Sequence, residues 1–181
     1  MAFDTALGWA DPVRLRDGRS VLIRPARRSD AELVQAFVRG LSAASRYERF
    51  FLAFRELPPS LLERIVGADQ RHDVSLLALT ACTDTRIAVV GLAQYAVGGD
   101  GAAEVAVVVG ERWRRAGLAT RMLFGLGEFA AANGLKQVQA DILRQNAAAL
   151  GLATKFHASF GRGSAGANAV QVSRSAGLEG R

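Results

Sequence analysis

An apolar run, a basic turn containing glycine and a long helix-forming run follow one another between residues 104 and 133. Residues 104–109 are typical of a buried strand, and residues 118–133 place apolar side chains on one face of a helix. The turn reads Arg114-Arg115-Ala116-Gly117. The first amides of a helix lack hydrogen-bond partners, and the helix dipole there favours an anion. The pattern therefore predicts a strand–turn–helix unit that binds a phosphate-bearing cofactor.

The residues of this turn have the chemistry that a phosphate site needs. Gly117 has no Cβ, so the backbone can approach a phosphate closely. Arg114 and Arg115 offer charge-assisted donors. Further backbone N–H donors are expected from Ala116, Leu118, Ala119 and Thr120.

Length and composition favour one domain over residues 1–181 with a sizeable core, because half of the residues are apolar. The net charge is +6, and Lys136 and Lys155 are the only lysines among 23 basic residues. We interpret this charge as a solvated basic surface. Because the chain has neither a helix-turn-helix pattern nor an aromatic-and-basic motif, no nucleic-acid partner is expected.

The few cysteines and histidines argue against a metal site. Cys82 is the only cysteine, and we expect it to be an ordinary buried residue. His72 and His157 are isolated, so no metal cofactor is expected. The N-terminus lacks the pattern of a signal peptide, and no apolar stretch is long enough to span a membrane. We therefore expect a cytoplasmic protein with no membrane partner, either a monomer or a homodimer.

Periodicity and capping residues predict the order of the elements. Ser29 or Asp30 is expected to cap a first helix, Ser42 a second and Asn146 the last one. Gly125 and Gly127 weaken the long helix, so close packing is expected there. Strands are predicted at 13–15, 21–24, 74–80, 86–97, 103–109, 137–143 and 169–173, and helices after residue 30, after residue 42, and at 61–66, 118–133 and 147–156.

This order of elements, together with the turn, resembles the GNAT acetyltransferase superfamily. The turn matches the family signature as Arg114-x-x-Gly117-x-Ala119, with alanine in place of the commoner final glycine. The last helix begins with Asn146, as in the family. Residues 14–175 are covered, and the N-terminal third is similar to the acetyltransferase domain of bacterial protein-lysine acetyltransferases. That similarity rests on Arg16-Asp17-Gly18, Ile23-Arg24-Pro25, Gly40-Leu41-Ser42, Ser45-Arg46-Tyr47 and Phe50-Phe51.

The resemblance implies an α/β (α+β) fold. Its central mixed sheet would be mostly antiparallel, with about six or seven strands and flanking helices. Two neighbouring parallel strands would splay apart at the cofactor cleft. Backbone groups of Val107, Val108 and Val109 would then bind the pantetheine arm of acetyl-CoA, and the turn would bind its pyrophosphate. Asn146 either binds the pantetheine or serves only as a helix N-cap.

The resemblance also implies acetyl-CoA as donor and an amine as acceptor, either a protein lysine or a small molecule. Glu104 is the candidate general base in a direct attack within a ternary complex; the alternative is a charged strand end that faces solvent. Many family members have a tyrosine in the last helix where this chain has Ala153. A second hypothesis is therefore a non-catalytic module that binds or senses acyl-CoA.

Overall fold

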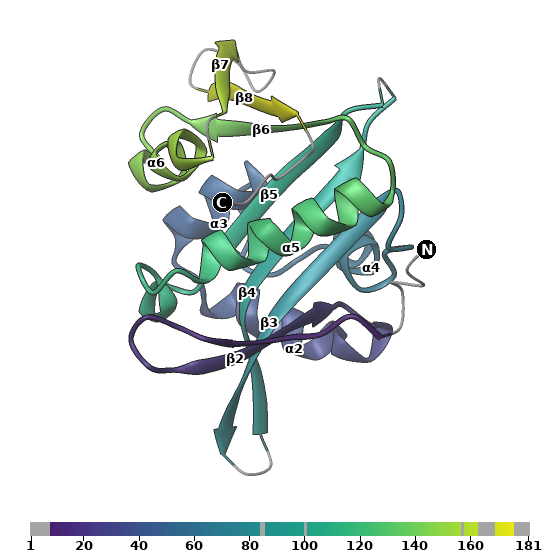
Figure 1. Ribbon diagram of the computed structural model, residues 1–181. Helices are drawn as coiled ribbons and strands as arrows, with labels where there is room; N and C mark the ends of the chain where they lie inside the picture. The colour runs from purple at the N-terminus through teal and green to yellow at the C-terminus, as the bar shows by residue number, and fades with distance from the viewer. Residues whose placement is uncertain (1–7, 84–85, 100, 157, 163–168, 176–181) are drawn as a thin grey trace.

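The computed structural model describes residues 8–83, 86–99, 101–156, 158–162 and 169–175. Its eight strands form one sheet in the order β1-β2-β3-β4-β5-β6-β8-β7 (Figure 1). The pair β5–β6 is parallel and the other neighbours are antiparallel. The strands are β1 Asp11–Arg14, β2 Ser20–Pro25, β3 Asp73–Thr83, β4 Arg86–Val97, β5 Ala103–Val109, β6 Gln137–Leu143, β7 Ser159–Arg162 and β8 Ala169–Ser175. The prediction of a mixed, mostly antiparallel sheet is confirmed; its edges are the short strands β1 and β7.

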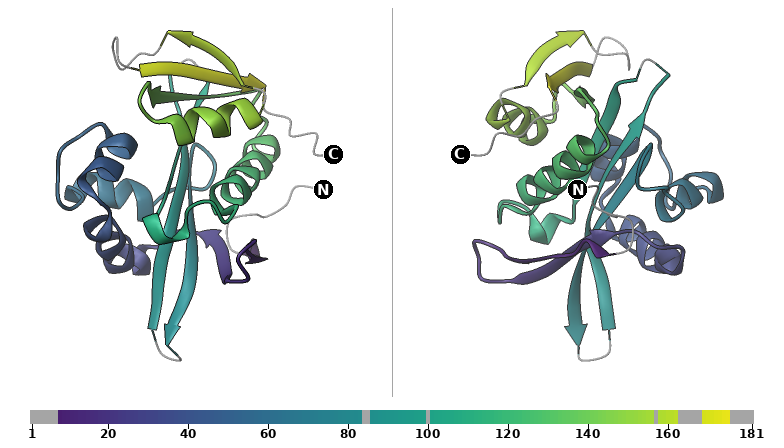
Figure 2. Two further views of the ribbon diagram at one scale, coloured as in Figure 1. Left: turned by 90° about the vertical axis from the view of Figure 1, so that its left-hand side faces the viewer. Right: turned by 45° about the vertical axis from the view of Figure 1, so that its right-hand side comes forward.

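Helices cover both faces of the sheet. Figure 2 shows α2, α3 and α4 on one side of the sheet and α5 on the other, with α6 beside β6. The first three are α2 Ala31–Gly40, α3 Ala43–Phe50 and α4 Pro59–Val66, and the others are α5 Leu118–Ala132 and α6 Ala147–Lys155. Two short 3₁₀ turns, η1 Arg28–Asp30 and η2 Glu111–Trp113, precede α2 and α5.

The predicted helix caps differ in how they work. Ser42 caps α3 as expected, because its Oγ accepts the Ser45 N–H at 3.1 Å. Asp30 occupies the N-cap position of α2, but its carboxylate makes other bonds. It accepts the Arg27 N–H at 2.8 Å and both terminal nitrogens of Arg24 at 2.7 and 2.8 Å. Asp30 therefore ties β2 to the start of α2.

Each face of the sheet has its own apolar core. On one face, Met122, Leu126 and Phe129 of α5 pack on the sheet, as their spacing predicted. On the other face, α2 and α4 supply residues such as Val34 and Ile65. Gly125 fits the expectation of close packing, because a Cβ there would lie 3.0 Å from the Trp9 ring and 3.2 Å from the Leu76 side chain.

The β3–β4 hairpin projects beyond the helices (Figure 1). Cys82, near the end of β3, is exposed, which corrects the expectation that it is buried. The physical reason is that this end of the hairpin extends past the helices that cover the sheet. Within the described residues, no helix has both the length and the apolar character needed to cross a membrane.

Candidate active site

The parallel strands β5 and β6 separate soon after they meet. Their register contains only the pairs Ala103–Val138 and Glu104–Gln139, although both strands continue further. A cavity of about 400 Å³ opens between them, lined by residues of α3, α5 and α6 as well as the two strands. The splayed strand pair expected at the cofactor cleft is therefore present.

The backbone of β5 presents polar groups to this opening. Gly110 N–H donates to the Val90 carbonyl of β4 at 2.9 Å. Because backbone groups alternate sides along a strand, Val107 and Val109 point theirs away from β4, toward β6. Val107 also lines the cavity. The Val109 carbonyl accepts a bond from Arg114 Nε at 3.2 Å. Val108 points its backbone groups to β4, and its side chain is buried in the core beneath α2 and α4.

The predicted phosphate-binding turn joins η2 to α5. Arg115 and Gly117 have positive φ values of 62° and 91°, which fold the chain tightly at this point. Gly117 is the N-cap of α5, and it has no side chain that could accept a helix amide. The first helical bond runs from Arg121 N–H to the Gly117 carbonyl at 3.1 Å. The amides of residues 118–120 lie in the first turn of α5, before that bond, and have no acceptor within the helix. An anion site requires such free N–H donors.

Two arginines of the β1–β2 turn, Arg16 and Arg19, lie near this turn. Arg16 N–H donates to the Ala116 carbonyl at 3.2 Å, and a Cβ placed on Gly117 would lie 3.7 Å from Arg16 Nε. Arg19 covers the ring of Trp113 with its guanidinium carbon 4.0 Å from the ring centre. The β1–β2 turn therefore adds positive charge next to the amides that open α5.

Sequence reasoning missed the position of Arg16. The motif Arg16-Asp17-Gly18 marked a turn, but nothing local in the sequence shows which distant loop a turn contacts. Trp113, beside the turn, packs against the α5 core and lies under Arg19.

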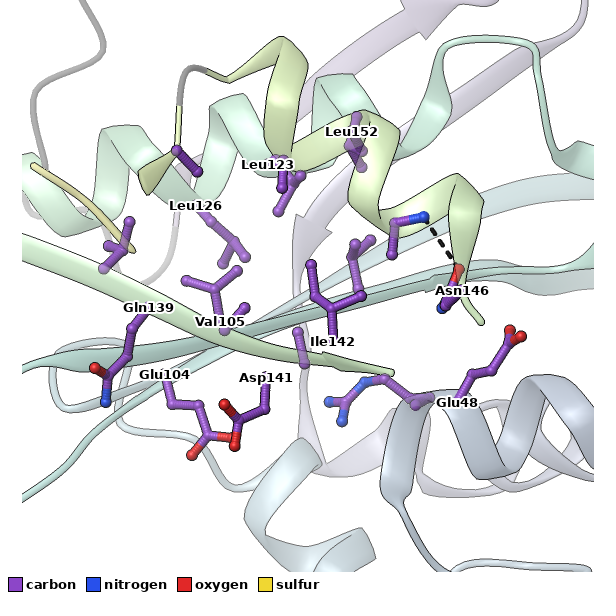
Figure 3. A pocket seen from close by; sticks show the side chains of 18 of the residues that line it. Glu48, Glu104, Val105, Leu123, Leu126, Gln139, Asp141, Ile142, Asn146 and Leu152 are labelled. Atoms are coloured by element: carbon purple, nitrogen blue, oxygen red, sulfur yellow. Dashed lines mark hydrogen bonds between the residues drawn. The ribbon is translucent and has the colours of Figure 1, made fainter. Parts of the chain in front are cut away.

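Among the described residues, three carboxylates line the cavity. Glu104 is exposed and lines the cavity, and Figure 3 shows its side chain and that of Asp141 reaching to the same side of the strands. Glu48, in α3, also lines the cavity. Asp141 and Glu48 were not predicted as site residues. Figure 3 shows Glu48 on the side of Asn146, apart from Glu104 and Asp141.

One cation lies among these carboxylates. Arg49 donates to Gln94 Oε1, and Gln94 Nε2 donates to Ser75 Oγ at 2.9 Å. Burial lowers the pKa of Arg49 to about 10, an effect that the nearby negative charge of Glu104 partly opposes. Arg49 therefore stays protonated at neutral pH and is held in place by β4.

The opposite wall of the cavity is mainly apolar. Asn146 lines it, and its Oδ1 accepts the Ala149 N–H at 3.0 Å, so the residue is an N-cap of α6 (Figure 3). Ala153 lines the same wall and contributes no hydroxyl. A mainly apolar channel with one strand of backbone amides suits an extended arm of alternating methylene and amide groups. The residues present therefore fit the pantetheine arm of acetyl-CoA.

The described residues contain no group of three or more His, Cys, Asp or Glu side chains that could hold a metal ion. His72 Nδ1 lies 3.0 Å from Asp69 Oδ2, in a loop before β3. His157 lies outside the described residues.

Comparison with known proteins agrees with this geometry. Residues 20–159 match the model of a family described as an acetyltransferase (GNAT) domain. The chain belongs to this family. GNAT domains bind acetyl-CoA and act on amine acceptors, and this chain is an acetyl-CoA-dependent N-acetyltransferase.

Relatives support the same assignment. The chain is 34% identical over 125 residues to the Pseudomonas aeruginosa acetyltransferase PA5475. This match covers 68% of this chain and 67% of that protein. The fold of this chain matches the GNAT domain of S. lividans PAT with a TM-score of 0.83 and 25% identity, over 92% of this chain and 97% of that one. A cAMP-binding acyltransferase from Mycobacterium smegmatis shares the fold with a TM-score of 0.61 and 20% identity. That match covers 93% of this chain but only 48% of the mycobacterial protein.

Proposed function

We propose that this GNAT chain transfers the acetyl group of acetyl-CoA to a primary amine, with a protein lysine as the acceptor, by direct attack in a ternary complex. One observation carries the proposal: the gap between β5 and β6 begins at Glu104 and leads toward the turn that opens α5. Val109 is five residues further along the strand than Glu104, which is about 17 Å of extended chain. Glu104 lines the cavity at the start of this stretch, and the turn that precedes α5 lies beyond its far end.

The cofactor would lie along this channel. The amides of Arg115, Ala116, Gly117, Leu118, Ala119 and Thr120 would bind its pyrophosphate, helped by the positive charge of Arg16. The backbone N–H and C=O of Val107 would bind the amides of the pantetheine arm as an added strand would. Val108 supports this strand from the core behind it, and Asn146 keeps α6 against the channel.

The reaction needs a neutral amine, because a protonated one has no lone pair to attack with. Glu104 would accept the proton of the ammonium group. The amine nitrogen then forms a bond to the acetyl carbon, and the carbon–sulfur bond breaks. The nitrogen then releases its second proton to water, and the coenzyme A thiolate that leaves takes up a proton from water, since Ala153 offers no acidic group. A backbone N–H of β5 near Val107 would stabilise the negative oxygen of the intermediate.

The acceptor would enter from the side of α3. Glu48, Glu104 and Asp141 provide negative charge there, which attracts an ammonium group. A lysine on a protein surface fits because Tyr47 and Leu52 are exposed near this helix, with 47% and 56% of their surface accessible. Similarity to the GNAT domain of S. lividans PAT is consistent with this assignment.

Calorimetric titration with acetyl-CoA, followed by thiol release, tests the proposal. Wild-type protein should bind acetyl-CoA, and Gly117→Asp should not, because it places a carboxylate where the pyrophosphate would lie. Thiol release should then occur with a lysine peptide and fail with the same peptide after its lysines are acetylated. Binding without turnover on either peptide or on small amines would instead indicate a module that only binds acyl-CoA.

A further inference from the structure

A network of hydrogen bonds joins α3 to the segment just before the phosphate-binding turn. Glu111, the first residue of η2, accepts the Ser42 N–H at 3.0 Å and the Ser45 hydroxyl at 2.5 Å through the same carboxylate oxygen. Arg114 Nη2 donates to Ser45 Oγ at 2.7 Å. Two segments more than 60 residues apart in sequence therefore share one polar contact.

The geometry fixes the direction of each bond. The Ser45 hydroxyl donates to Glu111, because a carboxylate can only accept. Ser42 Oγ lies 2.7 Å from Ser45 Oγ, so the Ser42 hydroxyl must donate to it. Ser45 is 3% exposed and uses its one donor and two lone pairs in three bonds. The Ser45 hydroxyl therefore uses its full hydrogen-bonding capacity within the network.

The charge state of Glu111 suits this role. Partial burial opposes ionisation, but the bonds from Ser45 and Ser42 outweigh it and lower the pKa of Glu111 to about 2. The carboxylate is therefore ionised throughout the neutral range, and its position 3.8 Å from Arg114 Nη2 adds an attractive interaction.

Each end of the network reaches one half of the site. Arg114, three residues before Gly117, also donates from Nε to the carbonyl of Val109 at the end of β5. At the other end, α3 carries Glu48 and Arg49, which line the cavity on the acceptor side. Ser45 of α3 and Glu111 of η2 thus form the contact between the acceptor helix and the segment that leads into the cofactor turn.

We propose that Glu111 is a positioning residue that couples the phosphate-binding turn to α3, so that an occupied turn holds the acceptor side of the cavity in place. This inference rests on the proposed function, since it requires a cofactor at the turn. Coupling of this kind is reciprocal: a ligand that orders the turn also orders α3, because both contact the same fixed groups.

Hydrogen exchange measured by mass spectrometry tests the coupling without a known acceptor. The probe is 3′-phospho-ADP, the part of coenzyme A that lacks the pantetheine arm and so cannot reach the lining residues of α3. In the wild-type protein it should slow exchange in peptides covering residues 115–121 and, by about fivefold, in peptides covering α3. In Glu111→Gln the first effect should remain and the second should be lost.

Two network variants and one control variant distinguish the possible results. Ser45→Ala removes the bridging hydroxyl and should lose the same α3 protection, which serves as the second test if Glu111→Gln does not fold. Glu128→Gln makes the same chemical change at an exposed site on α5 and should behave as wild type. Protection of α3 that persists in both network variants, or that is absent in the wild type while residues 115–121 are protected, overturns the coupling. Absence of protection in both segments of the wild type argues against the cofactor site itself, and the coupling fails with it.

Discussion

Glu104 and Gln139 form the last backbone pair between β5 and β6, and the two strands separate immediately beyond them. The carboxylate proposed as the base therefore lies where the two strands begin to separate. A side chain on a paired strand residue is held more firmly than one on a loop, and general base catalysis depends on such positioning.

Glu104→Gln should lower kcat/KM for the amine by about 100-fold or more, since a glutamine cannot accept the ammonium proton. Acetyl-CoA affinity should change little, because the phosphates and pantetheine are bound by other residues. Thiol release and calorimetry measure the two quantities. Glu128→Gln, exposed on α5, is the matched control. Turnover equal to that of wild type would remove Glu104 from the mechanism.

Arg16→Ala should weaken acetyl-CoA binding by about tenfold, the effect of losing one charge-assisted hydrogen bond to phosphate. The affinity of the wild type should also fall with added salt more steeply than that of the variant. Arg64→Ala, on α4 at the opposite face, provides the control. If the two variants bind equally well, the Arg16 side chain is not a phosphate contact.

Asp30→Asn should lower the free energy of unfolding by about 3 kcal/mol at neutral pH, because it leaves Arg24 without its buried partner. Partial burial opposes ionisation, yet the bonds from Arg24 and Arg27 outweigh it and lower the pKa of Asp30. A lowered carboxyl pKa stabilises the fold above the unfolded value of about 3.9, and this contribution disappears as the pH falls through the folded pKa.

The variant should therefore differ most from wild type at neutral pH and converge with it in acid. Urea unfolding at several pH values measures this. Asp17→Asn removes a pair with Arg19 that is exposed, and its effect should be smaller. A difference between wild type and Asp30→Asn that is constant down to strongly acidic pH would argue against an ionised pair.

Two glycine substitutions in helices should have opposite effects. Gly125→Val should destabilise the protein by about 2 kcal/mol. An added Cβ alone would lie 3.0 Å from the Trp9 ring, so the two methyl groups of valine would have no room. Gly151→Ala in α6 meets nothing within 4 Å and should stabilise it by about 0.5–1 kcal/mol. Thermal unfolding compares them. Equal effects would mean that α5 does not pack as closely as described.

Local patterns in the sequence predicted most of the elements. The bounds of β5 and β6 were predicted to the residue, because unbroken apolar or alternating runs are flanked there by glycines or polar turns. The Ser42 cap was predicted because its bond is made within three residues. Cys82 was placed wrongly, since burial depends on which segments cover a strand end.

The site residues also fall into those that the sequence predicted and those that only the structure revealed. The sequence by itself determined the turn at 114–120, the strand that leads into it and the candidate base, because these lie within one short stretch whose chemistry is local. Only the tertiary structure showed that Arg16 lies beside Gly117, that Asp141 faces the same cavity end as Glu104, and that Glu111 binds Ser45. Those contacts join segments from 37 to 101 residues apart, and which distant surfaces meet is decided by packing across the whole sheet.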